Sequence, residues 1–283
     1  MLSFITWNID PEAFSLFGRE IRWYGILWAT GVLLTTLVVR RMYRKENLSE
    51  QWFDSLFMYI IIGLIAGARL GHCLFYDPVY YLSNPLSMLK VWEGGLSSHG
   101  GAIGMTIAIW LYSVRITKKS MIWALDRLIV GVAIGATFIR LGNLMNSEIY
   151  GGPTQLPWGF NFVRDQRWHL PLTQGGSGEL PCHPTQLYEA LIYLAIFGLG
   201  LYLFYKTNAK TKQGLILGVS LIGIFLSRFC IEYIKNIQEP FEVEMIANYG
   251  INMGQLLSIP FFLWGGWLVW NALRKKETTN NKK

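Results

Sequence analysis

Residues 121–141 read MIWALDRLIVGVAIGATFIRL, an apolar run whose charges are confined to Asp126, Arg127 and Arg140. A helix needs about 20 mostly apolar residues to cross the hydrocarbon core of a bilayer. The composition agrees with this reading, because the 283 residues are 52% hydrophobic and only 15% charged, against roughly 25% charged residues in soluble domains. The sequence therefore predicts a membrane protein.

Six further apolar segments flank this run on both sides. The predicted spans are 23–39, 55–76, 95–114, 121–141, 185–205, 214–234 and 253–271. We predict an all-α polytopic membrane protein with seven transmembrane helices and a small extracytoplasmic cap. Its parts are an N-terminal interfacial arm at 1–22, a seven-helix transmembrane domain at 23–273 with an outer insert at 143–184, and a cytoplasmic tail at 274–283.

The basic residues predict the orientation of these spans. Four short stretches, after the first, third, fifth and seventh spans, hold 15 of the 25 Lys and Arg residues. Short loops rich in Lys and Arg stay in the cytoplasm. The N-terminus is therefore predicted outside and the C-terminus inside. The net charge of +7 reflects these anchors and does not indicate the nucleic-acid partner that it would suggest in a soluble protein.

Polar side chains inside the spans are costly to bury, so each is a candidate functional residue. With the predicted orientation, six of them, each from a different span, lie in the outer half of the bilayer. Anchoring of Tyr and Arg at the outer interface accounts for one or two of them but not for the whole set. They are Tyr24, Arg69, His99, Arg140, Glu189 and Arg228. Asp126 and Arg127, near the cytoplasmic end of their span, are interpreted as snorkelling or as paired with each other.

The most specific motif, GATFIRLGNLMNSEIYG at 135–151, lies where the fourth span ends. If the helix persists, Arg140 and Asn143 are one turn apart on the same face. A guanidinium group with amide neighbours suits bidentate recognition of a phosphate, and its charge is not lost by titration. Asn146 and Glu148 follow within the same motif. The motif therefore indicates a site for an anionic group.

A histidine opens the third span within the glycine-rich segment GGLSSHGG at 94–101. Glycines allow the backbone to approach a ligand closely, and an imidazole is the usual proton acceptor near neutral pH. A lone histidine at a helix end is more often a hydrogen-bonded structural residue. The flanking glycines and the shared depth favour the functional reading of His99.

Two further groups of polar residues open the fifth span and close the sixth. His183, Gln186 and Glu189 recur at three-residue spacing and so project roughly to one side, although a helix cap would explain them equally well. Arg228 and Glu232 stand four residues apart, close enough for an ion pair. That pair could be structural, or its arginine could also hold a phosphate.

Other small residues carry no predicted chemistry. Cys73, Cys182 and Cys230 are isolated in the sequence, which implies neither a disulfide framework nor zinc-ligand spacing. Several glycines within the spans predict close packing of helices. These are Gly63, Gly67, Gly71, Gly131, Gly135, Gly214 and Gly218.

Taken in order along the chain, these motifs resemble the bacterial phosphatidylglycerol:prolipoprotein diacylglyceryl transferase family. The family signature Gly-x-x-Arg-Leu-Gly-Asn-x-x-Asn-x-Glu is matched from Arg140 to Glu148 with Gly151 following, while its leading glycine is shifted to Gly135 or replaced by Ala136. Other matching landmarks are Trp23-Tyr24-Gly25, Ser98-His99-Gly100-Gly101, the segment 183–189, Arg228 with Glu232, and the segment 253–260.

The resemblance implies an enzyme. Members transfer the sn-1,2-diacylglyceryl group of phosphatidylglycerol to the lipobox cysteine thiol of a prolipoprotein, forming a thioether and releasing glycerol phosphate. This is the first step of bacterial lipoprotein maturation. The implied partners are phosphatidylglycerol, prolipoprotein signal peptides and membrane lipids, with no nucleic acid. The implied location is the bacterial plasma or inner membrane, with the active site in the outer half of the bilayer and with no cofactor or metal.

The resemblance also implies roles for the candidate residues. His99, Arg140 and Arg228 would be catalytic, with His99 as the candidate base for the thiol. Phosphatidylglycerol would be bound by Tyr24, Arg140, Asn143 and Asn146. Supporting roles fall to Arg69, Glu148, Gly151, His183, Gln186, Glu189 and Glu232.

Three other classes of membrane protein fit the sequence less well. A transporter or channel should show a polar path through both leaflets, whereas the inner halves of the spans are almost bare. An intramembrane protease would need a motif such as Gly-x-Ser-x-Gly or His-Glu-x-x-His, and neither occurs. An alcohol phosphotransferase acting on lipid headgroups would need a run of metal-binding aspartates, but the aspartates here are scattered.

Overall fold

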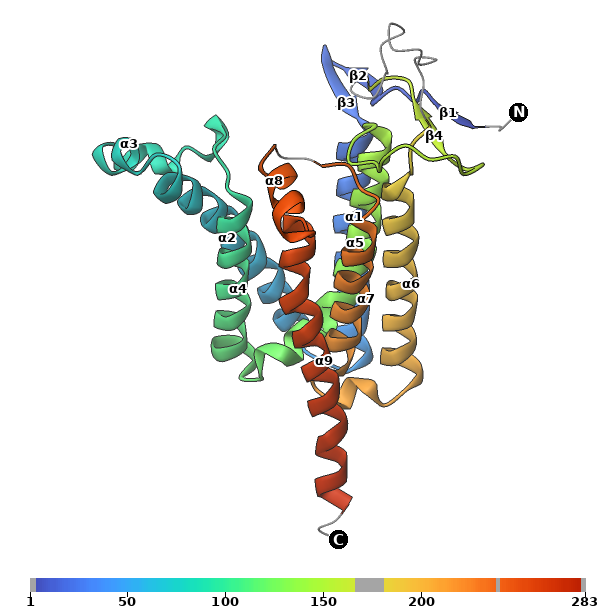
Figure 1. Cartoon of the computed structure of the whole chain (residues 1–283). Coiled ribbons are helices and arrows are strands. Elements are labelled where there is room, and N and C mark those ends of the chain that lie inside the picture. Colours follow the sequence, from blue (N-terminus) through green and yellow to red (C-terminus); the bar gives the residue numbers. More distant parts are fainter. Residues whose placement is uncertain (1–3, 166–180, 238–239, 281–283) are drawn as a thin grey trace, which may run out of the picture. The chain divides into compact units, whose positions relative to one another are not determined.

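The computed structural model describes residues 4–165, 181–237 and 240–280 of the chain (Figure 1). Helices dominate it. The long helices are α1 (Trp23–Lys45), α2 (Glu50–Phe75), α4 (Ser98–Tyr112), α5 (Met121–Met145), α6 (Thr185–Lys206), α7 (Leu215–Ile231) and α9 (Met253–Asn280). The shorter helices α3 (Pro78–Ser83) and α8 (Pro240–Tyr249) were not among the predicted elements.

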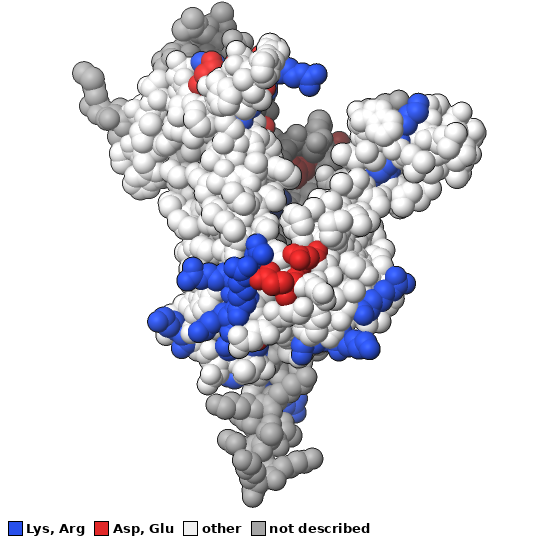
Figure 2. Space-filling model, turned by 180° about the vertical axis from the view of Figure 1, so that it is seen from behind, with Lys and Arg blue, Asp and Glu red and all other residues white. Residues whose placement is uncertain are grey.

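Each of the seven predicted apolar segments overlaps one of the long helices, and five of these helices extend beyond the predicted bounds. Within the described residues, five helices are long and apolar enough to cross a membrane: α1, α2, α5, α6 and the part of α9 from Met253 to Arg274. The other two are shorter, with 15 residues in α4 and 17 in α7. On the face drawn in Figure 2, uncharged side chains cover most of the surface. The chain is therefore an integral membrane protein.

The chain forms two compact units, residues 1–37 with 126–283 (unit 1) and residues 38–125 (unit 2). In unit 2, α2 packs directly against α4. Cβ atoms added at Gly63, Gly67 or Gly71 would collide with the facing segment at Gly100 or Gly104. These glycines therefore bring the two helix backbones together, as the sequence predicts.

In unit 1, α7 packs against both α6 and α9. Gly218 faces Gly265 at the α7–α9 contact, where an added Cβ would lie 2.7 Å from the Gly265 carbonyl oxygen. Asp126 joins α5 to this group, because its carboxylate accepts the backbone N–H groups of Gly214 at 2.7 Å and Leu217 at 2.8 Å. Asp126 thus caps the N-terminus of α7. The sequence predicts snorkelling of Asp126 or its pairing with Arg127 and does not predict this cap.

Short strands accompany the helices of unit 1, an addition to the all-helical prediction. The strand β1 (Ile5–Trp7) pairs in parallel with β4 (Phe160–Phe162), while β2 (Glu12–Leu16) and β3 (Arg19–Arg22) form an antiparallel hairpin. Phe17 and Gly18 turn this hairpin with φ of 50° and 74°, as a two-residue turn with left-handed backbone requires. The N-terminal segment and the insert at 143–184 therefore meet through strand pairing.

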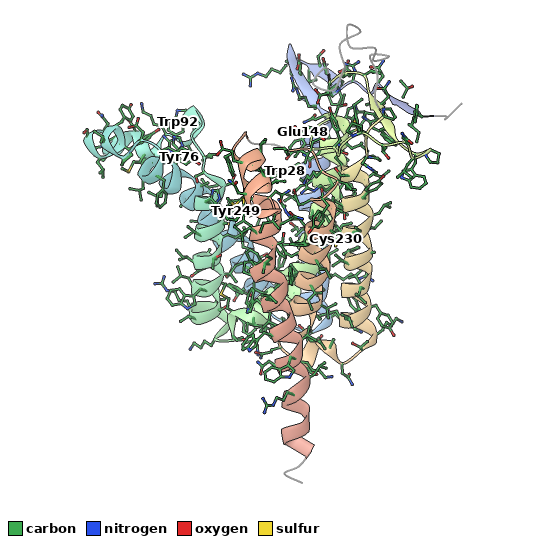
Figure 3. All side chains as sticks on the ribbon, viewed as in Figure 1. Trp28, Tyr76, Trp92, Glu148, Cys230 and Tyr249 are labelled. Carbon is green, nitrogen blue, oxygen red and sulfur yellow. The ribbon has the colours of Figure 1, made fainter. Side chains whose placement is uncertain are left out.

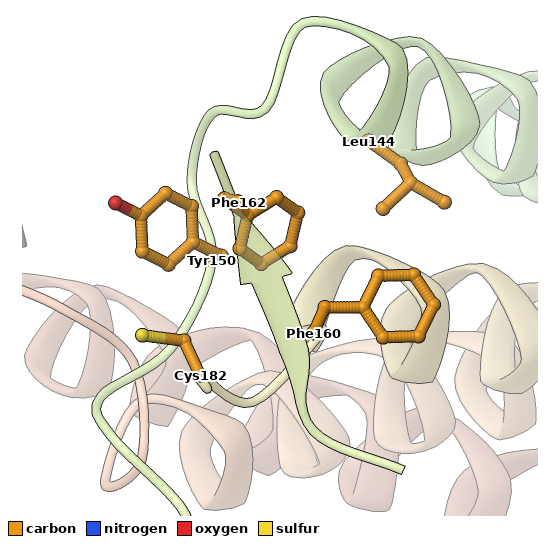
Figure 4. Packing of buried hydrophobic residues seen from close by; sticks show 5 residues of the cluster. All are labelled: Leu144, Tyr150, Phe160, Phe162 and Cys182. Carbon is orange, nitrogen blue, oxygen red and sulfur yellow. The ribbon is translucent and has the colours of Figure 1, made fainter. Parts of the chain in front are cut away.

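A small apolar cluster holds the insert onto the end of α5 (Figure 4). Phe160, Phe162, Tyr150 and Cys182 pack with Leu144, which belongs to the last turn of α5. The indole N–H of Trp7 donates to the carbonyl oxygen of Leu144 at 2.9 Å, which ties the N-terminal arm to the same point. This cluster fixes the segment that carries most of the predicted site motif.

Candidate functional site

Arg140, in the last turns of α5, is held by two partners. Its Nη1 donates to Asn143 Oδ1 at 3.2 Å, so the two residues share a helix face as their spacing predicts. Its Nε lies 2.9 Å from Glu189 Oε2 in an ion pair whose side chains are 14% and 1% exposed. A carboxylate this deeply buried is stable in its charged form only with a charged or hydrogen-bonding partner. Arg140 and Glu189 therefore depend on each other.

Glu148 gathers the amides of the motif. Its Oε1 accepts Asn143 Nδ2 at 2.9 Å and Asn146 Nδ2 at 3.2 Å. Asn143 uses its carbonyl oxygen toward Arg140 and its amino group toward Glu148, so its amide can take only one orientation. Figure 3 marks Glu148 just beyond the end of α5.

The backbone after α5 turns sharply to bring Glu148 back to this group. Ser147 and Ile149 have φ of 53° and 60°, a conformation that costs about 1–3 kcal/mol for a non-glycine residue. The first turn of α6 holds this strained turn, because Gln186 Nε2 donates to the carbonyl oxygen of Glu148 at 2.7 Å and Thr185 Oγ1 to that of Ile149 at 3.0 Å. Gln186 thus stabilises the backbone of the motif at Glu148.

Arg228 and Glu232 form the expected ion pair, with 3.5 Å between Nη2 and Oε1. Asn252, just before α9, donates from Nδ2 to the other oxygen of Glu232 at 3.2 Å. Asn252 is itself fixed by reciprocal bonds with Gln255 of 2.8 and 3.0 Å. The beginning of α9 therefore orients the carboxylate of Glu232. The segment 253–260 is a matching landmark of the sequence, which predicted no role for its residues.

Lys235 is the charged residue that the sequence reasoning missed. Its side chain is 2% exposed, and its Nζ lies 3.3 Å from Glu232 Oε1 and 3.7 Å from Glu189 Oε1. Burial lowers the pKa of Lys235, and the two carboxylates oppose that shift. Lys235 lies just after the predicted sixth span, so it was not among the charged residues predicted inside the spans. Its three-residue spacing from Glu232 was the available signal.

These contacts join into one group, the charge network of Arg140, Asn143, Glu148, Glu189, Arg228, Glu232 and Lys235. Residues from α5, the turn after α5, α6, the end of α7 and the segment after α7 meet in it. Such a network is costly to bury and is usually functional when it lies within a membrane protein.

Gly151 lies where the backbone after α5 pairs with the segment carrying Lys235. The two residues form an antiparallel bridge, and Gly152 N donates to the Ile234 carbonyl oxygen at 2.8 Å. A Cβ on Gly151 would lie 2.5 Å from that oxygen and 2.8 Å from His183 Cβ. The bridge can therefore form at this distance only with glycine at position 151.

Two other predicted residues lie beside the network. The ring of Tyr24 packs on Gly142, where an added Cβ would be 2.9 Å from Tyr24 Cδ2. His183 Nδ1 lies 3.4 Å from the hydroxyl of Tyr188, and partial burial lowers the pKa of this histidine. The carbonyl oxygen of His183 accepts Gly151 N at 2.8 Å. His183 thus contributes to the packing around Gly151.

The remaining two predicted residues belong to unit 2. His99 is exposed in the first turn of α4, which Ser97 caps by accepting Gly100 N at 3.2 Å. Arg69 is 3% exposed, and its guanidinium donates to the carbonyl oxygens of Ser87 and Met88 at 2.7 and 3.0 Å and also to that of Gly94. Arg69 therefore organises the loop that leads to His99.

Within residues 4–165, 181–237 and 240–280, no group of three or more His, Cys, Asp and Glu side chains is arranged to hold a metal ion.

Long apolar helices and an internal charge network define an integral membrane protein with a polar site among its helices. The chain belongs to the prolipoprotein diacylglyceryl transferase family, whose sequence model matches residues 11–271. A phosphatidylglycerol–prolipoprotein diacylglyceryl transferase of Porphyromonas gingivalis is 54% identical over 278 residues, which are 98% of this chain and 97% of the relative.

Proteins of the same name from other bacteria are also similar over almost their whole length. The one from Tolumonas auensis is 44% identical over 96% of this chain and 98% of its own length. The one from Chloroherpeton thalassium is 39% identical over 97% of each.

Proposed function

We propose that this chain transfers the sn-1,2-diacylglyceryl group of phosphatidylglycerol to the lipobox cysteine thiol of prolipoproteins. Its family and the names of its full-length relatives support this function. The observation that carries it is the charge network, in which two arginines are held by buried carboxylates among membrane helices. An anionic lipid headgroup is the substrate chemistry that such a site suits.

The reaction needs a nucleophile and a stabilised leaving group. The cysteine thiolate attacks the phosphate-bearing carbon of the diacylglyceryl group, where an S–C bond forms. The C–O bond at that carbon breaks, and its electron pair remains on the departing glycerol phosphate. Arg140 and Arg228 stabilise the negative charge that develops on glycerol phosphate. Asn143, Asn146 and Tyr24 fix the headgroup, while Glu148, Glu189 and Glu232 orient the cations and amides.

A base must take the proton of the thiol, because a thiol with an ordinary pKa near 8.5 is mostly protonated at neutral pH. His99 is the residue that we assign to this step. Its position in the first turn of α4, after the loop organised by Arg69, supports an accessible imidazole. Full transfer activity of a folded His99→Gln variant would overturn the assignment.

The proposed topology has seven spans, with the N-terminus outside and the C-terminus in the cytoplasm of a bacterial plasma or inner membrane. Helices in all seven predicted segments support it. The helical turns of α4 continue through a π-helical turn to Thr117, which gives 20 consecutive helical residues. α7, with 17 residues, reaches the lower limit for crossing the bilayer. In this topology the charge network and His99 belong to the outer half of the membrane, and no cofactor or metal takes part.

The function is tested with the purified chain, phosphatidylglycerol micelles and a synthetic lipobox peptide. We expect a peptide carrying a thioether-linked diacylglyceryl group, and no product from a matched peptide with Cys→Ser. Phosphatidylethanolamine in place of phosphatidylglycerol should give little product. Equal labelling of the serine peptide would contradict the proposal.

A further inference from the structure

We propose that Lys235 is a positioning residue of this site, which joins the two arginine–glutamate pairs and keeps the site attractive to an anionic lipid. This inference rests on the proposed function. The ammonium group of Lys235 lies between Glu189, the partner of Arg140, and Glu232, the partner of Arg228. The result is a chain of alternating charges from Arg140 to Arg228.

The charge balance of the network depends on this lysine. With every group ionised, the network is formally neutral. It carries three negative charges, on Glu148, Glu189 and Glu232, and three positive charges, on Arg140, Arg228 and Lys235. Without the lysine the carboxylates outnumber the cations. A phosphodiester would then have to enter a site of its own sign, where like-charge repulsion is strong because the surroundings are poorly solvated.

The position of the ammonium group is fixed by the backbone. Lys235 pairs with Gly151 in an antiparallel bridge, and Asn236 Nδ2 donates to the Gly151 carbonyl oxygen at 2.9 Å. This pairing locks the segment after α7 onto the segment after α5. Lys235 consequently reaches both carboxylates from a rigid part of the chain, with its side chain 2% exposed.

The test compares Lys235→Met, which keeps an unbranched side chain only one atom shorter but removes its charge, with Lys235→Arg, which keeps the charge. The purified full-length chain is assayed while phosphatidylglycerol and the lipobox peptide are varied separately. We expect Lys235→Met to lower kcat/KM for phosphatidylglycerol by at least about 30-fold, and Lys235→Arg to retain about a third of it or more. The KM for the peptide should change less than about twofold, because the lost charge acts on the lipid.

A second variant separates a charge effect from a packing effect. Glu232→Gln should lower activity in the parent chain, but in the Lys235→Met background it should raise activity by about threefold or more, because it restores the charge balance. If Lys235 only filled space, the activity losses of the two single substitutions would multiply in the double variant. Lys206→Met, at the exposed end of α6, is the matched control and should behave as the parent.

Four outcomes of these measurements would contradict the role of Lys235 or the proposed function. Lys235→Met within about threefold of the parent, or equal losses from Glu232→Gln in both backgrounds, would overturn the role of Lys235. If Lys235→Met does not fold, Lys235→Arg decides, because a loss of more than about 100-fold in a folded Lys235→Arg variant contradicts a charge role. If the parent forms no thioether, the proposed function fails instead.

Discussion

Glu189, with 1% of its side chain exposed, lies 2.9 Å from Arg140, so α6 supplies the counter-charge for the arginine at the end of α5. Removing one partner of a buried ion pair costs about 3–5 kcal/mol, because the other charge is left without compensation. The pair therefore makes the geometry of the site depend on the packing of two helices.

Arg140→Lys tests whether the guanidinium fork matters beyond its charge. A lysine can face Glu189 but cannot also bond Asn143 and a phosphate in fixed geometry. We expect kcat/KM for phosphatidylglycerol to fall about 100-fold. Arg115→Lys, at an exposed position in unit 2, should leave it unchanged. An Arg140→Lys variant with more than a third of the parent activity would show that charge alone suffices.

Gly151→Ala should displace the segment that carries Lys235. The added methyl group would lie 2.5 Å from the Ile234 carbonyl oxygen, and neither backbone segment can yield without breaking the bridge. We expect a destabilisation of about 2–3 kcal/mol, measured as a lower Tm, together with a large loss of transfer activity. Gly152→Ala is the control, since its Cβ would be 3.7 Å from the nearest atom, Asn236 Oδ1. Similar behaviour of the two variants would contradict the close approach at Gly151.

Asp126→Ala should affect stability and leave the chemistry intact. The substitution leaves the N–H groups of Gly214 and Leu217 without their acceptor, at a cost of about 1–3 kcal/mol. Thermal unfolding in detergent should show the lower Tm, while kcat per folded molecule stays within about twofold of the parent because Asp126 belongs to a structural cap. Asp54→Ala, exposed on α2, is the control and should unfold as the parent does. A loss of kcat at unchanged Tm would mean that Asp126 belongs to the site.

The thiol of Cys182 should resist alkylation in the folded chain. Burial, and to a smaller extent Asp165, raises the pKa of this thiol to about 11. A higher pKa lowers the thiolate fraction at pH 8 about 100-fold, and the thiolate is the reactive form. Mass spectrometry after iodoacetamide treatment should find Cys182 modified only once the chain is denatured. Rapid modification in the native chain would show that the cluster around Leu144 is not packed as described.

The sequence predicted the helices well because their apolar runs are long and uninterrupted. It also placed Arg140 and Asn143 on one face, since their contact is local and follows from helical spacing alone. Lys235 was not predicted because it lies just beyond the predicted sixth span. Its contact with Glu189 joins two segments far apart in the sequence, and local spacing cannot predict such a contact. For the same reason, the bonds from Arg69 to the loop before α4 could not be predicted.

The strands were missed for a different reason. β1 and β4 have three residues each and pair across more than 150 positions of sequence. Neither segment is long enough to show an alternating pattern. Pairing of this kind follows from tertiary packing around Leu144 and Trp7, which local propensity does not encode.

The proposed activity is the transfer of a diacylglyceryl group from phosphatidylglycerol to a thiol. The most direct measurement follows the mass of the lipobox peptide and the released glycerol phosphate in the same sample of purified chain. We expect one thioether-linked diacylglyceryl group for every glycerol phosphate released. Release of glycerol phosphate without lipidated peptide, or an unchanged peptide in the presence of folded chain and phosphatidylglycerol, would contradict it.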